Sequence, residues 1–426
     1  MHYLKQLIIL LVLVQPALYS QALIPDRKIS VEESVSTALN NRKEMLIAQN
    51  EIDLALQKVN EAGSYIYPKI DMTFNYSHTN TNQWMTLPPT FGSMIIPRST
   101  TGDYYLTRLS LWQHVYSGGV YTSNLKLSKS NMLRAQNQLK VINNEITFEV
   151  TQAYYDLLSV EEKLNAYTSV IASVEDIMRS NTAPNTSPGI IMKDILQDLL
   201  NENAFLKNKF EKDKLDFLRI IGLEFNTNIV LTGKFEPIPE AYDLNKLLAQ
   251  AFQYRPEPKQ TQLQEETDTL SVKLSQAARS PTITLGAHYE FPGEYLTFEN
   301  KNWNATINMN FPIADGFASI YRTRQKSKQK DQNLLKRKDL EDAIQFEVRK
   351  SFLAYSFWLN EISERETQLE NAENLLSTVN PSDAPSILQA YKSFLKYKLN
   401  YIDSVKEHLT SRAALEHAIG KTLVKE

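Results

Sequence analysis

The spacing of apolar residues changes within the first hundred residues. From Ser30 to about Gly63, apolar residues recur every three or four positions, which predicts an amphipathic helix. Ser30 and Glu33 have the spacing of a capping box, so we expect the helix to begin there. Pro68 ends this pattern, and from Ile70 the period becomes two, which predicts a strand.

Four segments alternate in this way and are predicted to be strands. In each, apolar and aromatic residues occupy one face and polar residues the other, over about ten residues. This length suits a transmembrane barrel, although a soluble antiparallel sheet on a core gives the same alternation. The predicted strands are 68–78, 104–114, 281–291 and 302–312.

Long helices are predicted beside the strands. Apolar residues between Val120 and Arg179 follow coiled-coil spacing, and a helix of that span measures about 90 Å at 1.5 Å per residue. A polar, proline-containing turn at 180–189 leads into a helix that ends at Gly222. The corresponding predictions for the second half are helices at 243–279, 317–376 and 386–420, with a turn at 377–385.

The second half of the chain repeats the first. Residues 29–75 align without a gap onto 242–288, and 106–222 onto 304–420. A unit of about 200 residues is too long for a solenoid repeat, so we expect one duplicated domain. The predicted organisation is a domain over 23–426, with repeats at 29–222 and 242–420 and equatorial segments at 223–242 and 421–426.

The start of the chain predicts export. Lys5 precedes an apolar run from Leu7 to Val14, which is far shorter than the roughly 20 residues of a membrane-spanning helix. We expect a secretion signal over 1–22, cleaved after Ser20 or Ala22. The chain has no cysteine and a net charge of −3, so it lacks disulfides and has no overall attraction for nucleic acid.

The chemistry of the chain gives no sign of catalysis. Its six histidines lack metal-ligand spacing, and neither a phosphate-binding loop nor a nucleophile elbow is present. We therefore expect a protein that is not an enzyme and needs no cofactor or metal. A basic run between Arg322 and Lys338 has two interpretations, a solvated helix face or contact with lipid phosphates.

Four strands cannot close a barrel, and an open sheet edge in lipid leaves backbone groups without partners. If the strands span a membrane, the protein is an oligomer. Two chains would supply eight strands, whose interior is nearly filled by side chains, whereas three would supply twelve and leave a bore. The pattern therefore favours a trimer.

Several short motifs occur in the same order in both halves. The helix opening at Ser30 is followed by Tyr67-Pro68-Lys69-Ile70 before a strand, and by the tract 149–158 within the long helix. Glycine-containing turns at 116–119 and 314–317 join strand to helix. In this arrangement the chain resembles the TolC-type outer-membrane factors, over essentially its whole length after the signal.

The resemblance implies a mainly α-helical protein with a β-barrel portion. Three copies would form a twelve-stranded barrel in the outer membrane of a Gram-negative bacterium and a coiled-coil α-helical tunnel in the periplasm. Such proteins are the passive exit ducts of tripartite efflux or type I secretion systems, for small molecules or proteins. The implied partners are a periplasmic adaptor, an inner-membrane pump and outer-membrane lipid.

The resemblance also points to individual residues. Asp194 and Asp198 are candidates for an acidic periplasmic gate, although helical acids also commonly face solvent. The corresponding segment of the second half, 384–390, has neither the family's glycine nor its aspartate, and Asp383 in the turn before it is a candidate substitute. Candidate adaptor-docking residues at the two turns are Gly189, Ile190, Ile195, Pro385 and Ser386. The polar faces of the strands offer candidate lumen-lining residues Asp71, Thr73, Asn304, Thr306, Asn308 and Asn310.

Two other classes of protein share part of this pattern. A periplasmic adaptor also combines a helical hairpin with strands, but it has one hairpin per chain, whereas two are predicted here. A periplasmic or surface coiled-coil structural protein would account for the helices. It would not account for aromatic-rich strand pairs at matching positions of both repeats.

Overall fold

The computed structural model describes residues 27–86, 95–181, 187–379 and 384–423, and these form two compact units. One, the hairpin unit, contains residues 27–41, 149–238 and 361–409. The other, the sheet unit, contains residues 42–148, 239–360 and 410–423. Each unit has segments of both predicted repeats, so the units do not coincide with the repeats.

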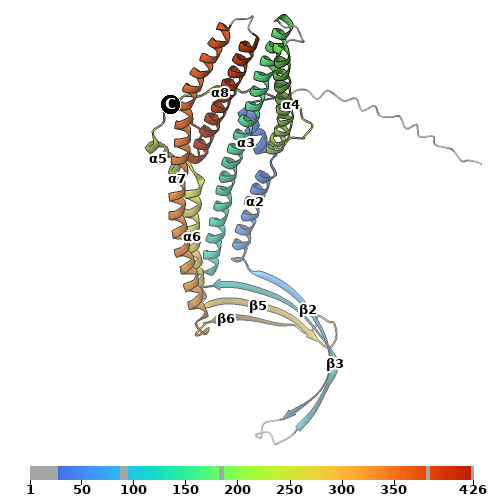
Figure 1. Cartoon of the computed structure of the whole chain (residues 1–426). Coiled ribbons are helices and arrows are strands. Elements are labelled where there is room, and N and C mark those ends of the chain that lie inside the picture. Colours follow the sequence, from blue (N-terminus) through green and yellow to red (C-terminus); the bar gives the residue numbers. More distant parts are fainter. Residues whose placement is uncertain (1–26, 87–94, 182–186, 380–383, 424–426) are drawn as a thin grey trace, which may run out of the picture. The chain divides into compact units, whose positions relative to one another are not determined.

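The sheet unit contains a four-stranded antiparallel sheet in the order β2-β3-β5-β6 (Figure 1). Each strand overlaps one of the four predicted strands. Their bounds are Lys69–Thr86 for β2, Ile95–Tyr116 for β3, Thr282–Gly293 for β5 and Asn302–Asn310 for β6.

The hairpin of β2 and β3 is longer than the alternation predicted. The two strands remain paired as far as Thr86, which lies opposite Ile95, so the loop predicted between residues 78 and 104 was too long. The added length is rich in threonine, a β-branched residue that favours strands, but it lacks the alternating apolar positions used to find the others. Residues 87–94 lie outside the described part of the chain.

Helices continue from the ends of these strands. The sheet unit includes α2 (Lys43–Ser64), α5 (Leu244–Tyr254) and α6 (Pro256–Ala277). It also includes parts of α3 (Val120–Asn181), α7 (Ala318–Thr378) and α8 (Ala384–Ile419). Buried apolar residues of α5, α7 and α8 form its core, namely Leu247, Ala251, Ile344, Val348, Tyr355, Leu415, Ala418 and Ile419.

Two helices that the sequence predicted as continuous are broken, so these predictions were wrong. The chain is extended at Arg42 (φ −68°, ψ 131°), between α1 (Val31–Asn41) and α2. It is extended again at Arg255 (φ −62°, ψ 138°), between α5 and α6. Pro256 explains the second break, because the ring of a proline disfavours helical backbone at the residue before it.

The hairpin unit contains α1, α4 (Ser187–Ile221) and a small parallel sheet of β1 (Arg27–Ile29) and β4 (Ile229–Leu231). The predicted capping box at the start of α1 is confirmed. The backbone N–H of Glu33 donates to Ser30 Oγ at 3.2 Å, and the backbone N–H of Ser30 donates to Glu33 Oε2 at 3.1 Å. These two backbone N–H groups at the start of the helix, which have no acceptor within it, are thereby hydrogen-bonded.

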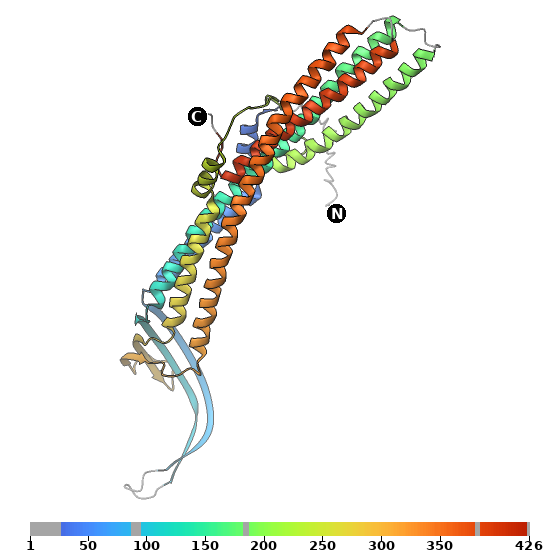
Figure 2. The same cartoon turned by 60° about the vertical axis from the view of Figure 1, so that its left-hand side comes forward.

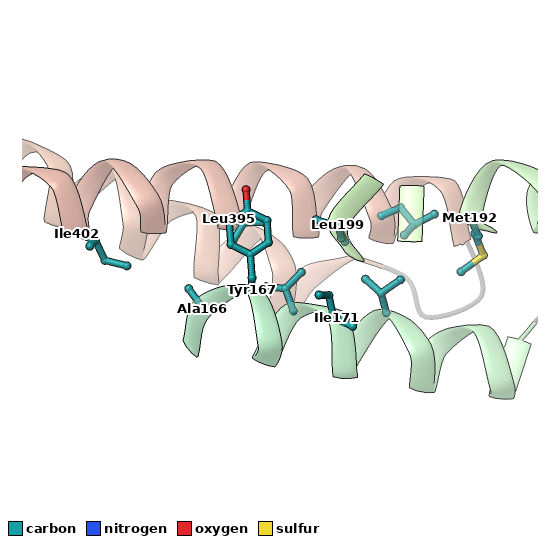
Figure 3. Close-up of a cluster of buried hydrophobic side chains, with 10 residues drawn as sticks. Ala166, Tyr167, Ile171, Met192, Leu199, Leu395 and Ile402 are labelled. Carbon is teal, nitrogen blue, oxygen red and sulfur yellow. The ribbon is translucent and has the colours of Figure 1, made fainter. Parts of the chain in front are cut away.

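The core of the hairpin unit joins three helices from both repeats. Figure 3 shows side chains of α3, α4 and α8 packed together, and Figure 2 shows α4 beside α3 and α8 beside α7 at their connected ends. The predicted turns at 180–189 and 377–385 are shorter than expected, because α4 and α8 begin within them. The core residues are Ala166, Tyr167, Val170, Ile171, Val174, Met192, Leu199, Leu388, Leu395 and Ile402.

Tyr154 of α3 joins the small sheet to this unit. Its hydroxyl donates to the carbonyl of Ile29 at 3.3 Å and accepts the N–H of Gly233 at 2.8 Å. A Cβ atom at Gly233 would lie 2.7 Å from that hydroxyl, so a glycine is required for this close approach.

Equivalent glycines end α4 and α8. Gly222 and Gly420 have φ of 71° and 70°, the left-handed conformation that glycine adopts without steric cost. The residues after them donate to Leu218 O at 3.0 Å and to Glu416 O at 3.2 Å, respectively. Both ends are thus Schellman caps, as the predicted stop at Gly222 requires.

Within the described ranges, none of the helices has a stretch that is long and apolar enough to cross a bilayer.

Candidate functional site

The register of the sheet gives it one polar and one apolar face. Asp71 pairs with Ser110, Ser110 with His288, and His288 with Asn304, so one row crosses all four strands. Directly paired residues of antiparallel strands share a face, and alternate residues along each strand return to it. The six residues predicted to line a lumen therefore lie on one face, namely Asp71, Thr73, Asn304, Thr306, Asn308 and Asn310.

Charged and aromatic side chains also occupy the polar face. Arg108 Nε lies 2.8 Å from Glu290 Oε1, which joins β3 to β5. The ring of Trp112 packs edge-on to that of His288, with centroids 4.6 Å apart. A Cβ atom at Gly286 would lie 2.8 Å from the Trp112 ring, so glycine makes room for the indole on this face.

The opposite face is apolar and exposed. Its central row pairs Met72, Leu109, Tyr289 and Trp303. Met72 is 71% exposed and Trp303 is 76% exposed, which is far beyond what a soluble sheet leaves uncovered in a continuous patch. Further exposed apolar residues on this face are Ile70, Phe74, Ile307 and Met309.

The sheet has two open edges, β2 and β6. Because β2-β3-β5-β6 is an antiparallel series of four strands, its first and last strands run in opposite directions. Within the described residues, neither edge pairs with a further strand. An exposed edge is a template for pairing with another chain.

The hairpin unit contains the candidate gate residues. Asp194 and Asp198 lie one turn apart on α4, and both are exposed. Ile195 is half-buried against the core cluster of this unit, whereas Ile190 is 63% exposed. The structure therefore brings the two acids to one exposed face of α4.

The remaining candidate docking residues lie at the starts of α4 and α8. Gly189 belongs to α4 and Pro385 to α8, and the exposure of these two residues is outside what the structure describes. Ser386 is exposed on the first turn of α8.

One group of charged residues in the sheet unit was not predicted as a site. The Arg255 guanidinium is 7% exposed and contacts three elements. Its Nη1 lies 2.6 Å from Glu347 Oε2 on α7 and 3.1 Å from the carbonyl of Ala418 on α8, and its Nη2 lies 2.6 Å from Glu257 Oε1 on α6. A Cβ atom at Gly420 would lie 3.0 Å from the Arg255 backbone, so the glycine permits this packing.

The Arg255 group perturbs the titration of its members. A hydrogen bond from His417 and the bonds from Arg255 outweigh desolvation and lower the pKa of Glu347 to about 2. Burial lowers the pKa of Arg255, but its bonds to Glu257 and Glu347 outweigh this and leave the pKa above its usual value. Both groups are therefore charged at neutral pH, and they fix α6, α7 and α8 to one another.

The sequence contained a signal for this group. The internal alignment places Arg42 on Arg255 and Glu44 on Glu257, which is a repeated Arg-x-Glu at the start of two helices. The long-range partner Glu347 is brought close only by the packing of α7. Within the described ranges, no cluster of three or more histidine, aspartate or glutamate side chains could hold a metal ion.

Comparison with known proteins finds one family model that matches part of the chain. The model of the outer membrane efflux protein family matches residues 34–184, which lie within the first repeat. The resemblance to outer-membrane efflux proteins is confirmed. Among curated protein sequences, none matches the chain.

Solved structures match over a longer span. The CmeC outer membrane channel of Campylobacter jejuni has a TM-score of 0.75 at 15% identity, over 92% of this chain and 85% of that one. VceC, an outer membrane protein of Vibrio cholerae, has a TM-score of 0.72 at 13% identity, over 92% and 96%. The MtrE outer membrane channel of Neisseria gonorrhoeae, in its open state, has a TM-score of 0.74 at 13% identity, over 92% and 89%.

These likenesses establish the fold. It is mainly α-helical with a four-stranded sheet per chain, as the sequence predicted. A single chain of this fold has an open sheet rather than a closed barrel, in agreement with its two free edges.

Proposed function

We propose that three copies of this chain form a channel through the outer membrane, through which solutes leave the cell passively. The observation that carries the proposal is the open, two-faced sheet. It combines a polar face across all four strands with an exposed apolar face and two unpaired edges. A bilayer tolerates strands only when every edge is paired, so the sheet requires further copies.

The direction of the edge strands permits closure. Since β2 and β6 run in opposite directions, β6 of one copy can pair antiparallel with β2 of the next without any change of topology. Such addition continues until the ring closes, with polar faces inward and apolar faces toward lipid.

The polar face favours three copies over two. Arg108, Trp112, His288 and Glu290 are large side chains on this face. An eight-stranded barrel has an interior that side chains nearly fill, whereas twelve strands leave an aqueous bore around them. In the trimer, Asp71, Thr73, Asn304, Thr306, Asn308 and Asn310 line that bore.

The turns at 180–189 and 377–385 are proposed to be periplasmic tips. There Asp194 and Asp198 form threefold acidic rings that gate the passage. Ile190, Ile195 and Ser386, with Gly189 and Pro385, form the surface for a periplasmic adaptor. Support comes from the exposure of both acids and of Ile190, together with the family match.

The cellular setting is part of the same proposal. The predicted signal at 1–22 directs the chain out of the cytoplasm to the outer membrane of a Gram-negative bacterium. An adaptor and an inner-membrane pump deliver the exported molecules, as in tripartite efflux or type I secretion. The match to the outer membrane efflux protein family favours efflux.

Disulfide cross-linking tests the closed ring. The chain contains no cysteine, so introduced thiols have no background. Thr73→Cys on β2 is combined in turn with Asn304→Cys, Thr306→Cys or Asn308→Cys on β6, which samples three registers on the polar face. We expect one pair to give a covalent trimer in outer membranes, and light scattering of the detergent-extracted protein to give three subunits.

A matched control uses the parity of the strand. Ile307 lies between Thr306 and Asn308 but on the apolar face, so Thr73→Cys with Ile307→Cys is expected to give no trimer. A soluble monomer, or cross-linked dimers alone, would contradict the channel. The coiled-coil structural protein would then be the better interpretation.

A further inference from the structure

Two of the junctions between strands and helices carry positive charge and no acid. Residues 115–130 contain two lysines and no acid, and residues 272–284 contain a lysine and an arginine and no acid. We call the exposed cations at these junctions and at the start of α7 the basic collar. All belong to the sheet unit, and they are Lys69, Lys126, Lys129, Lys273, Arg279, Arg322, Arg324, Lys326 and Lys328.

Helix α7 has opposite charge in its two parts. Residues 318–338 contain eight lysines and arginines against one acid, Asp331. Residues 339–378 contain three lysines and arginines against nine acids. A solvated helix usually mixes the two signs, so the cations are concentrated at the end of α7 that follows β6.

This placement opposes the intrinsic preference of a helix. The N-terminal end of a helix carries partial positive charge and favours acids. That preference is satisfied by Asp315, whose Oδ2 accepts the backbone N–H of Ser319 at 2.7 Å. The cations that follow gain nothing from the helix, and an external anionic partner would account for them.

Pairing within the chain leaves these charges largely available. Arg322 lies 3.8 Å from Asp315 and is 62% exposed, and Lys328 lies 3.3 Å from Asp331 and is 82% exposed. Ion pairs this exposed contribute little, because water and salt screen them.

Exposed apolar and aromatic side chains accompany the cations. Tyr67 is 71% exposed, Ile313 is 96% exposed and Phe317 is 68% exposed. Lys69 Nζ lies 5.0 Å from the centroid of the Tyr65 ring, and Arg324 lies 5.9 Å from that of Tyr321. Aromatic rings beside cations are typical of segments at the interface of a bilayer.

We infer that the basic collar binds the headgroups of anionic phospholipids in the leaflet on the helix side of the membrane. This rests on the proposed channel, which puts the strands in the bilayer and the helices outside it. The junction then lies at headgroup depth, where the aromatic rings enter the interface and the cations contact phosphates. The collar fixes the depth of the strands in the membrane.

Two pairs of lysines on α7 provide a matched test. Lys326 and Lys328 are eight and ten residues after Ala318, which places them about 12 and 15 Å along the helix. Lys336 and Lys338 have the same spacing and are also exposed, but they lie about 15 Å farther on. That separation is about two Debye lengths at physiological salt.

The full chain and both double variants, K326Q/K328Q and K336Q/K338Q, are reconstituted into phosphatidylcholine vesicles. Trace spin-labelled phosphatidylglycerol or phosphatidylcholine reports the lipid beside the protein by electron paramagnetic resonance. We expect the unaltered protein to prefer phosphatidylglycerol, and the preference to weaken in high salt. Each lysine at a bilayer surface contributes roughly a fivefold preference, and two together multiply to about 25-fold. Salt screening over about 12–15 Å to the start of α7 reduces this, so K326Q/K328Q is expected to lose about two- to fivefold and K336Q/K338Q almost none.

Ion conductance of the same vesicles separates the two proposals. A protein that conducts but shows no preference for phosphatidylglycerol overturns the collar and leaves the channel intact. The collar is also overturned if the two double variants lose the preference for phosphatidylglycerol equally, or if neither variant loses it. Protein that fails to insert overturns the channel and the collar with it.

Discussion

Arg42 and Arg255 occupy equivalent positions of the two repeats, and each breaks a helix, but only Arg255 precedes a proline. The two backbones are nearly the same, with ψ of 131° and 138°. Each arginine also pairs with the glutamate two residues on, at 2.6 Å to Glu44 and 2.6 Å to Glu257. The break therefore does not depend on proline, which reinforces a conformation that the repeated Arg-x-Glu already adopts.

The second copy adds long-range bonds to this shared geometry. Arg255 also binds Glu347 and the carbonyl of Ala418, and Glu347 in turn lies 3.4 Å from His417 Nδ1. The second copy thus joins three helices of the sheet unit through one buried cation. Its proline and its long-range partners can be removed separately.

The largest effect is expected from Arg255→Met, which keeps the length of the side chain and removes its charge. Glu257 and Glu347 would then lose their cationic partner. Because these glutamates are 26% and 39% exposed, the cost lies below that of a fully buried pair, at about 2–3 kcal/mol. Circular dichroism of the detergent-solubilised protein monitors the loss of helix as denaturant is added, and the transition gives the change in the free energy of unfolding. Arg349→Met, at an exposed site of α7, is the control and is expected to change stability by less than about 0.5 kcal/mol. Equal stability of the two variants would contradict the importance of the buried cation.

The sequence predicted the regular parts of the fold through periodicity. The alternation around Met72 and Trp303 identified strands, and the spacing between Val120 and Arg179 identified the long helix. Such periodic patterns arise because one face of a helix or strand lies in apolar surroundings and the other face does not. The duplication added the equivalence of Gly222 and Gly420, which proved to be matching caps.

Other features depended on information that periodicity lacks. The break at Arg42 has no proline, so only the alignment with Arg255 could have revealed it. The outer part of the β2–β3 hairpin has no alternating apolar face, so periodicity could not identify it as strand. The approach of Arg255 to Glu347 joins residues 92 apart in the chain, and no local pattern encodes that contact.

Acid should lower the free energy of unfolding by protonating Glu347, the long-range partner of Arg255. Its pKa in the folded protein is about 2, below the usual value of 4.5, so its contribution to stability is present above about pH 4.5 and is lost as pH falls toward 2. Because the side chain is 39% exposed, solvent screening reduces the contribution to about 1 kcal/mol. Denaturation of the unaltered protein and of Glu347→Gln is measured from neutral pH to pH 2. The difference between them should shrink across that range, and a constant difference would contradict this role of the carboxylate.

The smallest effect is expected from exchanging the proline between the copies. Arg42 already has the extended backbone that a following proline requires. Lys43 is the first residue of α2, and the backbone N–H of a first helical residue has no acceptor within the helix, so proline can replace it without loss of a helical hydrogen bond. Lys43→Pro should therefore raise the free energy of unfolding by about 0.4–1 kcal/mol, because it restricts the unfolded chain. Lys43→Ala controls for loss of the lysine side chain, and Pro256→Lys should lower stability by a similar amount while α5 and α6 remain separate helices. Destabilisation by Lys43→Pro relative to Lys43→Ala would mean that the two breaks differ in backbone geometry, and that proline in the second copy has a structural role absent from the first.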